Sequence, residues 1–302
     1  MIRVNLSLGI IIALVCWSAP LAAEPLKIVT TLPVYADLVR VIGGDLVDVS
    51  AVAPARFNPH FVEPKPSDVL RLKRADLFIH SGLDFELWRH PLTDAAGRSD
   101  LRPGGDRELD LSKFVRLLEI PQNTVTRAQG DIHIFGNPHY TLSPPNVRLI
   151  AKGITEKLSA VAPPSAAIFA QNLATWSNRL TAKEQSWRSL LAKLSGQPVI
   201  GYHNDWVYLA DYTGLKIDEF LEPKPGIPPS PQHLAELQQY ISRNKVRVII
   251  QSSFYPTDSS EELASRTGAR LLILCQNVGE LPECPDYISM LDYDLSILAQ
   301  EF

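Results

Sequence analysis

The sequence contains few of the residues and motifs that define the common enzyme classes. Its 302 residues include only three cysteines, two methionines and seven histidines. It has no H-E-x-x-H, G-x-S-x-G, P-loop or G-x-G-x-x-G motif, which excludes the peptidases, hydrolases and nucleotide-binding domains that these motifs mark. The sequence therefore favours binding over catalysis.

Basic clusters and long apolar runs are also missing. The formal net charge is −4, and no run of lysine and arginine points to nucleic acid or an anionic membrane as a partner. The apolar run in the first 23 residues is shorter than the roughly 20 residues that span a bilayer. With Arg3 near its start and small residues before Glu24, this segment predicts a signal peptide cut after Ala23. We expect an exported, soluble, periplasmic protein.

The cysteines fit export. Cys16 leaves with the signal peptide, and the bulky Val15 before it disfavours a lipoprotein. Cys275 and Cys284 remain as an even pair in an oxidising compartment, where a disulfide is the simplest expectation.

Short β-branched runs alternate with segments of helical apolar spacing, which is typical of parallel α/β units. The runs cover residues 26–33, 47–54, 76–82, 198–203, 246–252 and 270–276. Between the third and fourth runs, residues 164–195 lack internal proline and glycine and predict one rigid helix. We therefore predict two parallel-sheet α/β lobes, 24–163 and 196–302, joined by this helix after the signal peptide 1–23.

The tetrapeptide NPHF at 58–61 returns as NPHY at 137–140. The proline before His60 and before His139 stiffens each loop, so an imidazole there has little entropy to lose on binding. His203 ends a predicted strand of the second lobe, where open α/β sheets bind their ligands. Three imidazoles in the cleft between the lobes would suit zinc, copper or nickel better than manganese or calcium.

The other four histidines are weaker candidates. His80 also ends a predicted strand, so it either lies behind a ligand or faces solvent. His90, His133 and His233 lie in loops or at a helix start, where a histidine usually has no ligand role. A zinc-dependent hydrolase, with Glu63 as the base near His60, is the enzymatic alternative.

Several segments together resemble one known family, the periplasmic zinc/manganese-binding components of ABC importers. The matching segments are NPHFVEPKPSDVLRLKRADLFIHSGLDFELW (58–88), GNPHYTLSPPN (136–146), GYHNDW (201–206) and PGIPPSPQHLAEL (225–237). The resemblance implies a metal held between the lobes by His60, His139 and His203 and then passed to a membrane permease. The third ligand tends to be a carboxylate in manganese-type members, so His203 favours Zn²⁺ as the transported ion.

The fourth ligand position departs from that family. The family commonly has an Asp after the final strand, and Cys275 falls there in this sequence. A Cys275 thiolate would complete a zinc site, whereas a disulfide to Cys284 would leave the position to water, Asn277 or Glu280. Zinc affinity should fall as the pH drops through the histidine range near 6.5.

The resemblance also implies the partners. We expect the permease subunit of an ABC importer, a periplasmic metallochaperone and no nucleic acid as partners, and a monomer as the working form. The alternatives are a manganese- or iron-binding member of the same family and a metal-binding adhesin.

Overall fold

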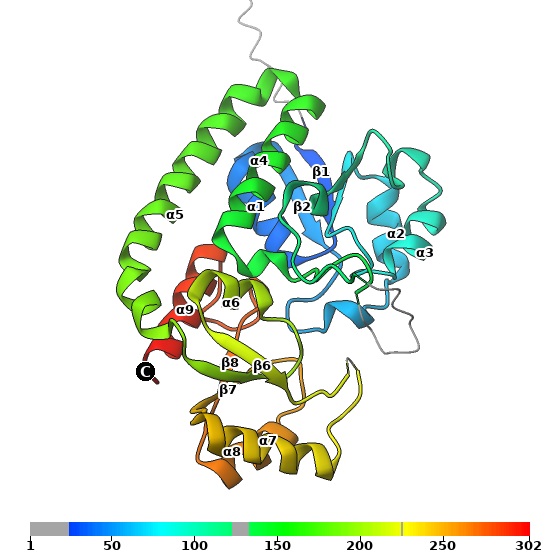
Figure 1. Cartoon of the computed structure of the whole chain (residues 1–302). Coiled ribbons are helices and arrows are strands. Elements are labelled where there is room, and N and C mark those ends of the chain that lie inside the picture. Colours follow the sequence, from blue (N-terminus) through cyan, green and yellow to red (C-terminus); the bar gives the residue numbers. More distant parts are fainter. Residues whose placement is uncertain (1–23, 123–132, 225) are drawn as a thin grey trace, which may run out of the picture.

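The chain forms two four-stranded sheets, one in each lobe, in a computed structural model that describes residues 24–122, 133–224 and 226–302 (Figure 1). The first sheet contains β1 (Leu26–Thr30), β2 (Val47–Ala51), β3 (Leu77–His80) and β4 (Glu108–Asp110) in the order β2-β1-β3-β4. The second contains β5 (Pro198–Gly201), β6 (Lys216–Phe220), β7 (Val248–Ser252) and β8 (Arg270–Leu274) in the order β6-β5-β7-β8. The predicted signal peptide lies outside the described residues.

All strand pairs in both sheets are parallel. The two central strands of each sheet have in-register partners, such as Ile28 with Leu77 and Val199 with Val248. Every residue of β3 and of β7 is buried, as expected where helices cover both faces of a parallel sheet. The strands of one sheet therefore all end at the same edge.

Most helices of both lobes begin at a proline or a capping side chain. The first lobe has α1 (Pro33–Gly43), α2 (Pro66–Lys73), α3 (Arg89–Ala96) and α4 (Pro144–Val161). The second has α6 (Val207–Thr213), α7 (Pro231–Asn244), α8 (Asp258–Thr267) and α9 (Tyr287–Ala299). Proline suits the first turn because its missing N–H has no partner inside the helix. Ser230 and Asp286 cap α7 and α9 with their side chains.

The predicted long helix is α5 (Ala166–Leu194), whose 29 residues run beside both lobes (Figure 1). At about 1.5 Å per residue it is roughly 43 Å long. Helix α9 packs against α5 and α1, and Trp187 of α5 donates a hydrogen bond to Asp292 at 2.8 Å. The predicted fold class, two parallel α/β lobes linked by a long helix, is confirmed. The division at residues 163 and 195 stays a prediction, because α9 follows the second sheet but packs on the first lobe.

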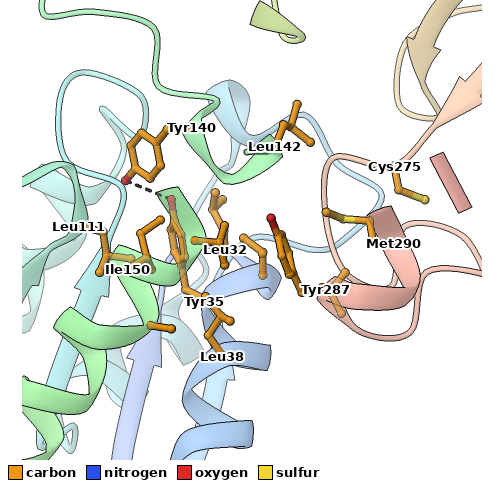
Figure 2. Close-up of a cluster of buried hydrophobic side chains, with 14 of the residues drawn as sticks. Leu32, Tyr35, Leu38, Leu111, Tyr140, Leu142, Ile150, Cys275, Tyr287 and Met290 are labelled. Carbon is orange, nitrogen blue, oxygen red and sulfur yellow. Dashed lines mark hydrogen bonds between the residues drawn. The ribbon is translucent and has the colours of Figure 1, made fainter. Parts of the chain in front are cut away.

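One hydrophobic core extends through both lobes. Figure 2 shows Tyr35 and Tyr140 of the first lobe in the same cluster as Tyr287 and Met290 of α9. The backbone N–H of Tyr287 also donates to the buried Asp37 carboxylate of α1 at 3.1 Å. A smaller core lies between the second sheet and helices α7 and α8. Opening the two lobes as separate bodies would expose the shared core, so we expect only limited movement between them.

None of the helices within the described ranges is long and apolar enough to cross a bilayer.

Candidate metal centre

The two NPH loops fold in the same way. The side-chain oxygen of Asn58 accepts from the backbone N–H of His60 at 3.0 Å, and Asn137 accepts from His139 at 3.0 Å. The proline between each pair fixes the backbone inside this turn. Trp88 adds a hydrogen bond to the Pro59 carbonyl at 2.8 Å. The repeated sequence therefore has a physical meaning: each copy builds a turn that presents one imidazole.

Hydrogen bonds on one ring nitrogen orient two of the three predicted ligands. Nδ1 of His203 lies 2.7 Å from a Glu222 carboxylate oxygen, and Nδ1 of His139 lies 2.9 Å from the Asn137 side-chain oxygen. When Nδ1–H donates to these oxygens, Nε2 is the atom with the lone pair that can bind a metal. Both residues are buried, His203 at 5% and His139 at 4% exposure.

The structure brings His60, His139 and His203 together. The ring centroids of His60 lie 5.6 Å from His139 and 5.7 Å from His203, and those of His139 and His203 lie 5.8 Å apart. The Nε2 atom of His60 is buried and has no hydrogen-bond partner among the described residues. A buried donor atom without a partner costs free energy, and a bound metal ion would remove that cost.

Two further donors lie in this cluster that the sequence did not single out as ligands. A carboxylate oxygen of Asp205 lies 3.0 Å from Nε2 of His139 and 3.7 Å from Nε2 of His203. The ring of His133 stacks on His60 at 5.1 Å. The donor atoms form two groups, and all atoms of one group lie within 4.8 Å of one another. One group is His60, His133 and His203, and the other is His139, His203 and Asp205.

The positions of these two donors carried a weak signal in the sequence. Asp205 lies two residues after His203 in the segment GYHNDW, and His133 lies six residues before His139. The only indication in the sequence was that each residue lies within a few positions of a strong ligand candidate. Neither spacing shows that the side chains converge, because both residues lie outside helices and strands.

Cys275 is bonded to Cys284 in a disulfide and is fully buried. Its thiolate therefore does not supply the fourth ligand, because the sulfur is already used. Glu280 accepts hydrogen bonds from the backbone N–H groups of Ser253 and Gln276, at 2.8 Å each, so this carboxylate shapes the turn. The segment after β8 reaches the cluster instead through the Gln276 side chain, which donates to Asp205.

The site holds the protonation states that metal binding needs. Burial lowers the pKa of His139 to about 4, although the Asp205 carboxylate opposes this shift. Burial, with the neighbouring imidazoles, lowers the pKa of His60 well below its ordinary value. Burial alone would raise the pKa of Asp205, but His203 and His139 outweigh it and the pKa is lowered. The imidazoles of His60 and His139 are therefore neutral and the Asp205 carboxylate is ionised near pH 7.

Three of the four weaker candidates lie outside the cluster. His80 is buried with Nε2 2.7 Å from Glu108, so it belongs to the interior of the first lobe. His90 is exposed in α3, and Nε2 of His233 lies 2.9 Å from the Phe220 carbonyl oxygen. Glu63, the base of the hydrolase alternative, is exposed and belongs to neither donor group.

A comparison with known families decides the class of this protein. Residues 28–301 match the family described as zinc-uptake complex component A, periplasmic. The chain belongs to that family. The resemblance read from the NPH, GYHNDW and PGIPPSPQHLAEL segments is thereby confirmed, and the family is one of transport components, not an enzyme class.

Known relatives cover nearly the whole chain. It is 26% identical to the zinc-binding lipoprotein AdcA of Streptococcus pneumoniae serotype 4, over 97% of this chain and 59% of AdcA. It therefore spans little more than half of that relative. It is 23% identical to the iron-binding protein YfeA of Yersinia pestis, over 93% of this chain and 87% of YfeA. A crystal structure of a ZnuA deletion mutant with zinc bound has a TM-score of 0.77 at 26% identity, over 92% of this chain and 98% of the other.

Proposed function

We propose that this protein is an extracytoplasmic solute-binding protein that captures Zn²⁺ and delivers it to an ABC-type importer. The observation that carries the proposal is the pair of adjoining donor groups, made of imidazole nitrogens and one carboxylate from both lobes, that share His203. Relatives described as zinc-binding, and the similar fold of a ZnuA variant with zinc bound, support it.

The proposed ligands are His60, His139 and His203, with Asp205 as the fourth. Ligand atoms about 2.0 Å from a tetrahedral zinc ion lie roughly 3.3 Å apart, close to the 3.0 Å between His139 and Asp205. Three nitrogens and one oxygen are an ordinary zinc ligand set, whereas manganese prefers mostly oxygen ligands. Imidazole also suits iron, and the likeness to YfeA makes iron the competing cargo.

The remaining features of the proposal follow from the family. A carrier of this kind works outside the cytoplasmic membrane, after removal of the predicted signal peptide, and docks on the permease subunit of its importer. We propose a monomer that catalyses no reaction and binds no nucleic acid. A periplasmic metallochaperone would supply zinc to the same site.

Metal analysis of the mature chain tests the proposal. Protein containing residues 24–302, purified without added metal, should hold zinc in excess of iron and manganese when analysed by mass spectrometry. Competition with a chromogenic zinc chelator should show tight binding that His139→Ala weakens. His90→Ala is the matched control, because it removes an exposed histidine outside the cluster. Equal zinc affinity in the wild type and in His139→Ala, or iron as the bound metal, would contradict the proposal.

A further inference from the structure

The two carboxylate oxygens of Asp205 have different partners. Oδ1 faces the imidazoles, because it lies 3.0 Å from Nε2 of His139 and 3.7 Å from Nε2 of His203. Oδ2 accepts a hydrogen bond from the side-chain amide of Gln276. Asp205 is only 1% exposed, so solvent has little access to either oxygen. One oxygen is therefore directed at the other donors of the centre, and Gln276 holds the second one.

The backbone on both sides of the Gln276 side chain is fixed. Cys275, the residue before it, is tied to Cys284 by the disulfide. The backbone N–H of Gln276 donates to the Glu280 carboxylate at 2.8 Å, and Gln276 as a whole is 5% exposed. A buried side chain on an anchored backbone has few rotamers to choose from. The amide of Gln276 therefore stays directed at Asp205.

The number of oxygens that a carboxylate offers decides which cation suits a site. Zinc in closed sites is almost always bound by four ligands, which three imidazoles and one oxygen supply. Manganese and calcium prefer more ligands, and a carboxylate that binds through both oxygens helps to supply them. An oxygen that is engaged in a hydrogen bond is less free to bind the ion. The hydrogen bond from Gln276 thus keeps Asp205 to one oxygen.

We propose that Gln276 is a selectivity residue, which holds Oδ2 of Asp205 and so favours Zn²⁺ over larger divalent cations that require more ligands. This inference rests on the proposed function, with Asp205 as a ligand. Gln276 does not bind the ion itself; it positions the carboxylate that does. Without its hydrogen bond, Asp205 is free to turn and bind through both oxygens, which suits a larger ion better than zinc.

The affinities for Zn²⁺ and Cd²⁺ test the proposal. Cd²⁺ has the same closed d shell as Zn²⁺ and is larger, so the pair of ions reports mainly on size. Gln276→Met keeps the length of the side chain and removes its N–H donors. In chelator competition the variant should bind zinc about tenfold more weakly than the wild type and cadmium as tightly or more tightly. Gln239→Met, which changes an exposed glutamine of α7, should match the wild type for both ions.

The visible spectrum of the Co²⁺-loaded protein gives a second readout, which reports coordination directly. The wild type should show the strong absorption bands of tetrahedral Co²⁺, and Gln276→Met should show weaker bands because the coordination number rises. Gln276→Asn keeps an amide but is one methylene too short to reach Asp205, so it should behave like Gln276→Met. It replaces Gln276→Met in both measurements if that variant does not fold, and the unfolding free energy of each metal-free variant is measured.

The failures of the two proposals are distinguishable. If the wild type binds no zinc, the proposed function is wrong. If the wild type binds zinc and the variants lose affinity for zinc and cadmium by the same factor, Gln276 only holds Asp205 in place and has no role in selectivity. Variants with the ion preference and the Co²⁺ spectrum of the wild type would also overturn the selectivity role, while the proposed function would stand.

Discussion

The two lobes contribute to the candidate metal centre in different ways. In the second lobe, residues two or three positions beyond each of the four strands enter the site: His203, Glu222, Tyr255 and Gln276 follow β5, β6, β7 and β8. Glu222 holds His203, while Gln276 and Tyr255 donate to Asp205, the latter at 3.5 Å. The sheet edge itself thus builds this half of the site, as expected for a parallel sheet.

In the first lobe, the strand ends serve the interior instead. His80 at the end of β3 pairs with Glu108, and the following Ser81 donates to the buried Glu86 carboxylate. The proposed ligands come from loops further along the chain, His60 nine residues after β2 and His139 in the segment between β4 and α4. The comparison teaches that one half of the site depends on the sheet and the other half on the stiffness of two NPH turns.

The largest loss of zinc affinity is expected on replacing His203, the proposed ligand that both donor groups share. His203 belongs to both donor groups, whereas His60 belongs to one. We expect His203→Ala to weaken zinc binding by about a thousandfold or more, about 4 kcal/mol at 25 °C. His60→Ala should lose less, because His139, His203 and Asp205 remain as a group. Chelator competition on both variants measures the difference, and a larger loss in His60→Ala would reverse this ranking.

The first lobe should also make the metal-free protein sensitive to acid. The pKa of His139 is about 4 in the fold and about 6.5 in the unfolded chain, so between these values only the unfolded state takes up the proton. Stability should therefore fall as the pH drops from about 6.5 to about 4, by up to about 3 kcal/mol from this group. For His139, the same low pKa predicts that protons compete with zinc only below the range near 6.5 that the sequence suggested.

Urea unfolding of metal-free protein at about pH 7 and about pH 4.5 measures this effect. His139→Gln removes the titrating group, so the difference between wild type and variant isolates its contribution from those of the carboxylates. An identical pH dependence in both proteins would show that His139 does not carry it.

The sequence predicted the local features well and the convergence of distant segments poorly. The alternating apolar runs and the long helix were readable because strand and helix periodicity are local properties. The NPH turns were readable because proline and asparagine act on their own backbone. The proposed fourth ligand was not readable from the sequence, because only the fold brings Asp205 to 3.0 Å from His139 of the other lobe. Counting positions along the family pattern pointed instead to Cys275, which the fold uses in a disulfide.

The smallest expected effect concerns the support behind each imidazole. In the second lobe a carboxylate, Glu222, faces Nδ1 of His203, whereas in the first lobe a neutral amide, Asn137, faces Nδ1 of His139. A carboxylate at Nδ1 makes Nε2 of the imidazole a more basic metal ligand. Glu222→Gln should therefore weaken zinc binding by about tenfold while keeping the hydrogen bond to His203. The matched control is Glu236→Gln, which changes an exposed glutamate of α7.

The second measurement is the unfolding free energy of the metal-free variant, because Glu222 also accepts a hydrogen bond from the backbone N–H of Gly226 at 3.2 Å. Weaker zinc binding with unchanged stability would show that the charge acts on the metal through His203; equal losses in both would mean that Glu222 only holds its loop.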